Sequence, residues 1–303
     1  MDTIPTLETW LALPTPEIAQ YVLPHRIAVM FTSDGTRRHY LLRHPEENGQ
    51  ITNFLAYQQH TAALYAHSFT LLYELGVQAI LTPGLYSLNF QRGSQMLQFF
   101  LDATQQSLLS EPLLSLYRIW DVQVRLYGDY DIAPAAEPIR DGLRSVEADL
   151  TALRPTGSRL LLFGYIADTF EVEYLQRGMA LQTALNRLPT PDEIRLACFP
   201  HGPQRIHIHL GGGWMRVGRV LPFALDDGAT DLYFATGLTF DLTEENIRRI
   251  LYDHLFLRHV APEDNVAYTP EMIAALRSYY AGHGENVIGL GRLVGPGLWY
   301  PEM

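Results

Sequence analysis

Residues 24–38 read Pro-His-Arg-Ile-Ala-Val-Met-Phe-Thr-Ser-Asp-Gly-Thr-Arg-Arg, and this stretch indicates both a fold class and the position of a site. Its first part, Arg26–Thr32, is short and apolar, which is typical of a strand buried on both faces of a sheet. Asp34 and Gly35 follow that strand and favour a turn. Thr36–Arg38 lies just beyond, where a helix can begin.

The rest of the chain alternates between strand-like and helix-like segments. Further strands are predicted at Val77–Thr82 (ended by Pro83-Gly84), Asp121–Tyr127, Arg159–Tyr165, Arg205–Leu210, Val220–Phe223 and Leu232–Ala235. Helices are predicted at Ile51–Leu75, Ser94–Leu109, Pro138–Leu153, from after Tyr165 to about Leu188, at Leu242–Leu257 with Thr243 as N-cap, and at Pro270–Tyr280. This alternation predicts an α/β fold with a mostly parallel central sheet flanked by helices. We expect one catalytic domain over residues 1–303, with a core at about 24–257 and a C-terminal appendage at about 261–303.

Composition excludes several classes of partner. The chain has 303 residues, of which 47% are apolar and 18% charged, enough for a sizeable core. A net charge of −11 disfavours nucleic acid and anionic lipid. The sequence has no run of about 18 apolar residues and no basic start before an apolar core, so we expect neither a membrane span nor a signal peptide. These features predict a cytoplasmic protein whose single Cys198 is buried and inert.

The turn after the first strand has the parts of an anion site. In an open parallel sheet, ligands bind outside the carboxyl ends of the strands. Gly35 allows a tight turn, so successive backbone N–H groups can point at one anion. The chain contains no lysine, so Arg37 and Arg38 supply guanidinium groups, which suit bidentate oxygen contacts. Asp34 can hold a divalent cation or a proton.

The same stretch resembles the start of the cis-prenyltransferases, in which a strand runs into Asp-Gly-Asn-x-Arg-Trp. Tyr73–Val77 and Tyr86–Arg92 resemble the family's Glu-Leu-Gly strand and its Ser-x-Glu-Asn-Trp-x-Arg loop. Asp231–Phe234 resembles its Glu-Leu-Tyr-Phe segment. The matches run in order from residue 24 to about 257. The resemblance implies an undecaprenyl diphosphate synthase-like fold, a homodimer and Mg²⁺.

A narrower resemblance covers nearly the whole chain. It is to the tuberculosinol synthase-like diterpene enzymes of this fold, which act on bicyclic diterpenyl diphosphates. The motifs that carry it are Asp34–Arg38, Tyr57–Gln59, Tyr127–Tyr130, Leu232–Phe234, Arg248–His254, Leu257–His259 and Ile288–Gly291. It implies a diterpene synthase rather than a chain-elongating enzyme.

One departure from the elongating enzymes supports that distinction. They build a second diphosphate site from Arg-x-Gly-Gly-Glu-x-Arg-x-Ser, and the equivalent stretch here is Leu210–Gly218. Arg216 is kept, but Leu210 replaces the first arginine and Gly218 the serine. Losing a cation and a hydroxyl costs several kcal/mol, at about 1.5–3 kcal/mol for each charged hydrogen bond. We therefore expect no elongation. Trp214 replaces the glutamate and is a candidate pocket residue.

The resemblance implies a specific reaction. The enzyme would ionise a bicyclic allylic diterpenyl diphosphate, with kolavenyl diphosphate preferred, and quench the cation with water to give a tertiary alcohol, kolavelool, and diphosphate. The diphosphate would be bound by Gly35, Thr36, Arg37, Arg38 and Arg92, and the cation shielded by aromatic rings such as Tyr57, Tyr86 and Phe90.

The water would be oriented or deprotonated by Asp34 or Tyr57. Mg²⁺ would be bound by Asp34, with Asp231 a doubtful second ligand. The alternatives are transfer to a nucleoside or other acceptor, or a non-catalytic subunit.

Other polar groups favour a structural role. His207 and His209 share a strand face and could bind a metal, but the pattern favours histidines of the core or rim. Arg248–Arg249 is typical of a solvated helix face, and Asp253–His254 of structural contacts. Tyr127–Tyr130 either lines a pocket or ends a strand.

Overall fold

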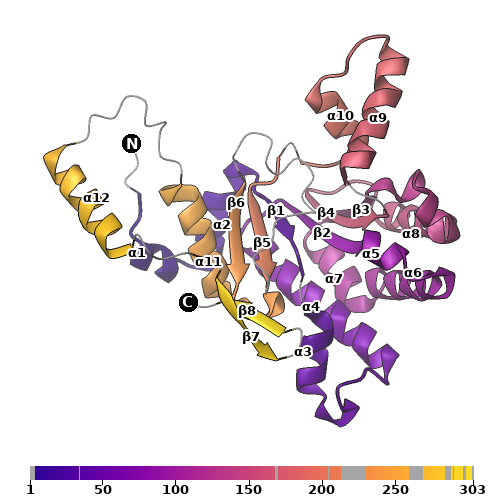
Figure 1. The fold of residues 1–303 in the computed structure, drawn as a ribbon, viewed down its shortest axis with the longest axis horizontal. Coiled ribbons are helices and arrows are strands. Elements are labelled where there is room, and N and C mark those ends of the chain that lie inside the picture. Colours follow the sequence, from indigo (N-terminus) through magenta and orange to yellow (C-terminus); the bar gives the residue numbers. More distant parts are fainter. Residues whose placement is uncertain are drawn as a thin grey trace.

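The computed structural model describes residues 4–33, 35–167, 170–203, 205–212, 230–258, 269–283, 288, 290–295 and 298–301. Its centre is a six-stranded sheet in the order β3-β4-β2-β1-β5-β6, in which every neighbouring pair is parallel (Figure 1). The strands are β1 Ala28–Phe31, β2 Ala79–Tyr86, β3 Val122–Tyr127, β4 Arg159–Ile166, β5 Ile208–Gly212 and β6 Asp231–Ala235. The predicted α/β fold is confirmed.

Helices connect these strands. They are α1 Leu7–Ala12, α2 Thr15–Val22, α3 Thr36–Arg43, α4 Phe54–Glu74, α5 Ser87–Phe90, α6 Ser94–Leu108, α7 Glu111–Ile119, α8 Arg140–Leu153, α9 Phe170–Leu185, α10 Pro191–Cys198, α11 Glu244–Tyr252 and α12 Pro270–His283. Short 3₁₀ turns include η2 Pro45–Glu47 and η5 Thr239–Asp241, and a π-helical turn, Asp253–Leu257, follows α11. A two-stranded antiparallel sheet, β7 Gly291–Gly295 and β8 Leu298–Pro301, lies near the C-terminus.

The central strands alternate between the two faces of the sheet. Val29 and Phe31 of β1 belong to a large apolar cluster that includes side chains of α1, α2, α4, α6, α7, α8 and α11. Met30 between them belongs to a smaller cluster, with Ile194 and Cys198 of α10. Because successive side chains of a strand point to opposite faces, β1 is covered on both sides. This burial explains the continuous apolar run by which the strand was predicted.

Two features of the fold differ from the pattern in the sequence. β2 was predicted to end before Pro83-Gly84, but it continues to Tyr86, with a register shift against β4 between Pro83 and Leu85. Such a bulge tolerates a proline that cannot donate to the ladder. Helices α1 and α2 were not predicted, yet Trp10 and Ile18 are fully buried in the large cluster, so the core extends to residues before 24. The expected strand Val220–Phe223 lies outside the described residues.

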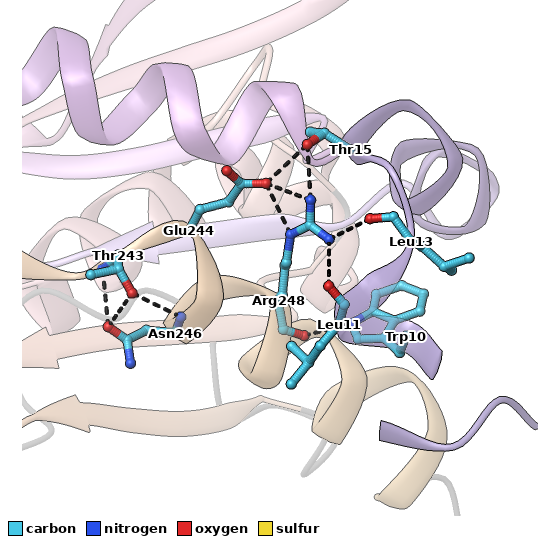
Figure 2. A network of polar contacts seen from close by, with 8 residues as sticks. All are labelled: Trp10, Leu11, Leu13, Thr15, Thr243, Glu244, Asn246 and Arg248. Carbon is cyan, nitrogen blue, oxygen red and sulfur yellow. Dashed lines mark hydrogen bonds and ion pairs between the residues drawn. The ribbon is translucent and has the colours of Figure 1, made fainter. Parts of the chain in front are cut away.

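The N-terminal helices are held by one arginine of α11 (Figure 2). The Arg248 guanidinium donates to the carbonyls of Leu11 and Leu13, at 3.2 and 2.6 Å, and to Thr15 Oγ1 at 2.9 Å. It also pairs with Glu244, at 2.6 Å. The prediction of a solvated Arg248 is therefore wrong, because the N-terminal segment folds over it. Arg249 pairs with Glu245 and is exposed, as predicted. Thr243 caps α11, as predicted, accepting from the amide of Asn246.

The α9–α10 hairpin projects from the sheet (Figure 1) and is fastened at its base. Glu173 is fully buried and pairs with Arg177 at 2.8 Å, and Arg177 also reaches Asp131 at 3.0 Å. Burial raises the pKa of Glu173 to about 7. Cys198 is buried beside this cluster, and burial raises the pKa of its thiol to about 12. The thiol is therefore inert at neutral pH, as predicted.

The contacts of Arg248 predict that substitutions at Arg248 and Arg249 lower the free energy of unfolding by different amounts. Arg248→Gln leaves two backbone carbonyls without their charged donor and is expected to lower the free energy of unfolding by about 2–3 kcal/mol. Its neighbour provides the control, since Arg249→Gln removes an exposed ion pair and should cost less than about 1 kcal/mol. Denaturant unfolding measures both. Equal losses would show that the network does not anchor the N-terminal helices.

Candidate active site

The turn after β1 lies where the strand order of the sheet reverses. The chain passes from β1 to β2 on one side, whereas β5 lies on the other side of β1 and leads away to β6. The Thr32 amide donates to the Leu210 carbonyl at 2.8 Å, so the ends of β1 and β5 are joined. A crevice at such a reversal, outside the carboxyl ends of the strands, is the general ligand position in open α/β sheets.

Gly35 gives this turn its shape. Its φ is 88°, in the left-handed region, and it is the N-cap residue of α3. A Cβ atom at this position would lie 2.6 Å from Leu238 Cδ2 and 3.4 Å from Arg38 Nε. The Arg38 side chain therefore folds back beside the turn, and Leu238 packs against it from the loop between β6 and η5. The first amides of α3 begin here, so the positive end of the helix adjoins the turn, as predicted.

The predicted diphosphate ligands reach the same edge of the sheet from two strands. Thr36, Arg37 and Arg38 form the first turn of α3, with Arg37 exposed and Arg38 partly buried. Arg92 is exposed just after α5, which follows β2, the neighbour of β1. Asp34 lies outside the described residues. Cationic side chains thus follow two adjacent parallel strands.

Two tyrosines of α4 contact the turn. The Tyr57 hydroxyl lies 3.0 Å from Thr36 Oγ1, next to the guanidinium-bearing residues. The Tyr65 hydroxyl lies 2.6 Å from Ser33 Oγ, on the other side of the turn. Burial raises the pKa of Tyr65, so it remains a neutral hydrogen-bonding group. Tyr57 was predicted as a site residue from the sequence, whereas Tyr65 was not.

The predicted aromatic pocket residues differ in exposure. Tyr86 ends β2 with 41% of its surface exposed, at the same edge as the turn. Phe90 is only 5% exposed and belongs to the large core cluster. Trp214 lies outside the described residues. Of these three positions, Tyr86 is the one with an accessible ring in the described structure.

The end of β5 corresponds to the start of the second diphosphate motif of elongating enzymes. Leu210, at the place of its first arginine, is 1% exposed and packs in the large cluster. His207 and His209 are buried in and beside β5: His207 Nδ1 accepts from the Ala28 amide at 3.0 Å, and His209 Nε2 lies 2.9 Å from Thr32 Oγ1. Burial lowers the pKa of His209 to about 4. These contacts support the predicted core role of both histidines.

The carboxylate of Asp231 is engaged by His254 and Arg258. Its Oδ2 lies 2.6 Å from His254 Nδ1, and its Oδ1 lies 3.3 Å from Arg258. Within the ranges that the structure describes, no group of three or more His, Cys, Asp or Glu side chains could hold a metal ion. These residues therefore do not form an all-protein metal cage.

Tyr127 and Tyr130 are buried at the end of β3. Tyr127 belongs to the smaller apolar cluster, and the Tyr130 hydroxyl donates to Glu147 at 2.5 Å. Between them, Asp129 accepts a hydrogen bond from the Ala167 amide at 2.6 Å. The contacts favour the structural alternative over a pocket lining.

One polar group beside the turn was missed by sequence reasoning. His39 is 4% exposed, its Nδ1 lies 2.8 Å from His60 Nε2, and its Nε2 lies 3.4 Å from Asp241. These three residues come from α3, α4 and η5, so no local pattern could connect them. The signal available in the sequence was His39 itself, which stands where the motif Asp-Gly-Asn-x-Arg-Trp of the cis-prenyltransferases has its tryptophan.

Comparisons with known proteins show what this chain is similar to. Among solved structures, the chain is similar to a probable undecaprenyl diphosphate synthase from Campylobacter jejuni, with a TM-score of 0.51 and 12% identity over 76% of this chain and 94% of the other. In sequence it is 28% identical to tuberculosinyl adenosine transferase from Mycobacterium tuberculosis, over 97% of each chain. It is 23% identical to (+)-kolavelool synthase from Herpetosiphon aurantiacus, over 100% of this chain and 97% of that one.

These similarities confirm the resemblance to the cis-prenyltransferase-fold diterpene enzymes that the Asp34–Arg38 turn and the later motifs carry. No family model matches the sequence. Both curated relatives are named as enzymes. No helix of the described ranges is long and apolar enough to cross a membrane.

The geometry of the Gly35 turn predicts a selective effect on anion binding. Gly35→Ala places an L residue in the left-handed region, at a cost of about 1–2 kcal/mol, and displaces Leu238. Relaxation of the turn should weaken the binding of inorganic pyrophosphate, measured by isothermal titration calorimetry, by roughly tenfold, since about 1.4 kcal/mol corresponds to that factor.

Gly49→Ala is the matched control. Gly49 has a φ of 78°, and a Cβ there would meet nothing within 4 Å. It should lose similar stability without losing affinity for pyrophosphate. Equal affinity losses in the two variants would contradict a specific role for the Gly35 turn.

Proposed function

We propose that this protein is a diterpene synthase that ionises a bicyclic allylic diterpenyl diphosphate, with kolavenyl diphosphate preferred, and adds water to the cation. The products would be a tertiary allylic alcohol, kolavelool, and diphosphate. The observation that carries this proposal is the Gly35 turn, with Arg37 and Arg38 on the first turn of α3 at the reversal point of the sheet. The similarity to (+)-kolavelool synthase over the whole chain supports the choice of product.

The first step of the proposed mechanism is cleavage of the allylic C–O bond. Both electrons of that bond leave with the diphosphate, and an allyl cation remains. Arg37, Arg38 and Arg92, with the first amides of α3, stabilise the negative charge that grows on the leaving group. Guanidinium groups suit this role because they donate two parallel hydrogen bonds to phosphate oxygens.

The second step is capture of the cation by water. Aromatic faces stabilise a nearby cation, and the exposed ring of Tyr86 at the end of β2 fits this role. The water oxygen forms a bond to the tertiary end of the allyl system, and its proton passes to Asp34 or is relayed through the Tyr57 hydroxyl. Tyr57 already lies within hydrogen-bond distance of Thr36, at the diphosphate turn.

Mg²⁺ fits this site only in one arrangement. Magnesium usually binds through one or two carboxylates and the substrate phosphates. Asp34 at the turn would supply such a carboxylate, whereas Asp231 is engaged by His254 and Arg258. When bound, Mg²⁺ would neutralise part of the diphosphate charge.

Three alternatives to the proposed reaction can be weighed against the described residues. The more similar of the two curated relatives is named an adenosine transferase, which favours a nucleoside acceptor as the second candidate. Chain elongation requires a second diphosphate site, and the burial of Leu210 at the place of its first arginine argues against one. A non-catalytic subunit would not need the Arg37–Arg38 pair.

A panel of substrates tests the proposed function. Purified protein with Mg²⁺ is incubated with kolavenyl, tuberculosinyl or geranylgeranyl diphosphate, with and without adenosine, and with farnesyl plus isopentenyl diphosphate. Gas chromatography–mass spectrometry of the extracts should show a tertiary alcohol from kolavenyl diphosphate. Arg37→Ala and Asp34→Ala are expected to lower the rate by about 10²–10³-fold, the usual effect of removing one group that stabilises or serves the transition state.

The controls are Asp141→Ala and Arg144→Ala, which alter an exposed ion pair on α8 and should keep the wild-type rate. Prenylated adenosine in the aqueous phase would replace the synthase proposal by the transferase. Longer prenyl chains would mean that Leu210 does not prevent elongation. No product from any diphosphate would favour the non-catalytic subunit.

The proposal includes a homodimer, which the resemblance to this family implies. The projecting α9–α10 hairpin carries the exposed apolar residues Leu175, Met179, Leu188 and Leu196, which an isolated hairpin leaves in water. Met179→Glu is expected to convert the dimer to a monomer in light scattering, because a charge would be buried in the interface. Met272→Glu, on the exposed face of α12, should leave the dimer intact. A monomeric unsubstituted protein would contradict the proposal.

A further inference from the structure

Helix α3 is attached to α4 by two polar contacts spaced one helical turn apart. Thr36 Oγ1 lies 3.0 Å from Tyr57 Oη, and His39 Nδ1 lies 2.8 Å from His60 Nε2. The paired positions are three residues apart on both helices, so the two contacts follow one another along the interface between α3 and α4, which is called the seam below. The Thr36–Tyr57 contact includes the diphosphate turn itself. The His39–His60 contact lies one helical turn further along, where His39 is buried.

A third segment, η5, also contacts His39. Asp241 of η5 lies 3.4 Å from His39 Nε2 and 3.1 Å from the Arg43 guanidinium. The His39 amide also donates to the Gly35 carbonyl at 2.7 Å, so the backbone of this residue is part of the turn. The chain Asp241–His39–His60 therefore joins η5, α3 and α4 directly beneath Gly35 and Thr36.

The proton positions in this chain follow from its partners. An ionised Asp241 only accepts, so His39 carries its proton on Nε2 and presents a bare Nδ1. His60 must then donate from Nε2 to His39 Nδ1. The contact requires one imidazole nitrogen without a proton, because a neutral His60 can also carry its proton on Nδ1 and accept from a His39 imidazolium. When both imidazoles are protonated, each directs an N–H group at the other, and the contact between α3 and α4 is lost.

We propose that His39 is a positioning residue for the diphosphate turn, and that the Asp241–His39–His60 chain holds α3 in its anion-binding orientation only while at least one of the two imidazoles is neutral. The inference rests on the proposed function, because it takes the Gly35 turn as the diphosphate site. It assigns a role to the residue that replaces the family's tryptophan. Protonation of the chain would release the first turn of α3, with Arg37 and Arg38, from its support.

The charges around the chain favour its neutral form. Arg43 of α3 opposes protonation of both imidazoles, and His44, which follows α3, opposes that of His60. Asp241 of η5 lies beside His39, and the ring of Tyr40, also on α3, packs against His60 while its hydroxyl donates to Glu47. Burial lowers the pKa of His39 first and Arg43 second, while Asp241 opposes them. Burial, then His39, His44 and Arg43, lower the pKa of His60.

The sign of the pH dependence follows from these directions. Both imidazoles have a pKa below the ordinary 6.5 when the seam is formed, so the closed seam binds fewer protons than the open one. Acidification below about pH 6.5 therefore favours the open seam, and affinity for a diphosphate should fall. Above that pH the seam is closed and its contribution is constant.

The experiment is calorimetric titration of the full-length protein with inorganic pyrophosphate at about pH 7.5 and about pH 5.5. The variants are His60→Gln, whose amide can still donate to His39 without titrating, and His60→Ala, which removes the donor. His67→Gln is the matched control, since His67 is exposed on the same helix, α4, and lies outside the chain. Comparison with the wild type at each pH cancels the titration of pyrophosphate itself.

We expect His60→Gln to bind like the wild type at the higher pH. On acidification the affinity of the wild type should fall by a factor at least about five times larger than that of His60→Gln, and His67→Gln should follow the wild type. His60→Ala should bind more weakly at both pH values, which a titration effect alone would not produce. A His60-dependent gain of affinity at low pH would overturn the inference, because imidazolium would then be an anion ligand. Binding independent of His60 overturns this inference alone, whereas no pyrophosphate binding by the wild type overturns the proposed site as well.

Discussion

Parallel pairing of β1 with strands on both sides is the constraint on which the rest of the structure depends. β1 hydrogen-bonds to β2 on one side and to β5 on the other, and the Thr32 amide extends the second ladder to the start of the turn. The residues after β1 therefore leave the sheet at a fixed place and direction. Because the strand order reverses here, the turn lies at the general position of a ligand in an open α/β sheet.

Around β1, apolar burial contributes stability, whereas directional polar contacts orient the turn that follows the strand. Val29 and Phe31 on one face, and Met30 on the other, bury β1 between two layers of side chains. This burial supplies free energy but little orientation, since it is non-directional. The orientation of the turn depends on hydrogen bonds to Tyr57, Tyr65 and His60, whose geometry is strict.

The same division appears at the outer helices. Arg248 fastens α1 and α2 through backbone carbonyls, and Glu173 with Arg177 fastens the α9–α10 hairpin. In both places one guanidinium with several acceptors joins segments distant in sequence. A chain without lysine has only arginine for this purpose, and the planar five-donor group suits it better than an ammonium group. The arginines of the candidate site are thus a minority with a separate role.

The sequence by itself determined the strand–turn–helix unit at residues 26–43, the parallel α/β class and most helices, because these depend on local periodicity and on residues such as Gly35 with restricted alternatives. It also determined the residue types at the candidate diphosphate turn. Only the tertiary structure decided that Arg248 is a partly buried anchor, that β2 continues through Pro83, and that His39 meets His60 and Asp241. These outcomes depend on contacts between residues up to 237 positions apart. Such contacts leave no local pattern, since a hydrogen bond between distant side chains requires only compatible atoms and not a sequence spacing.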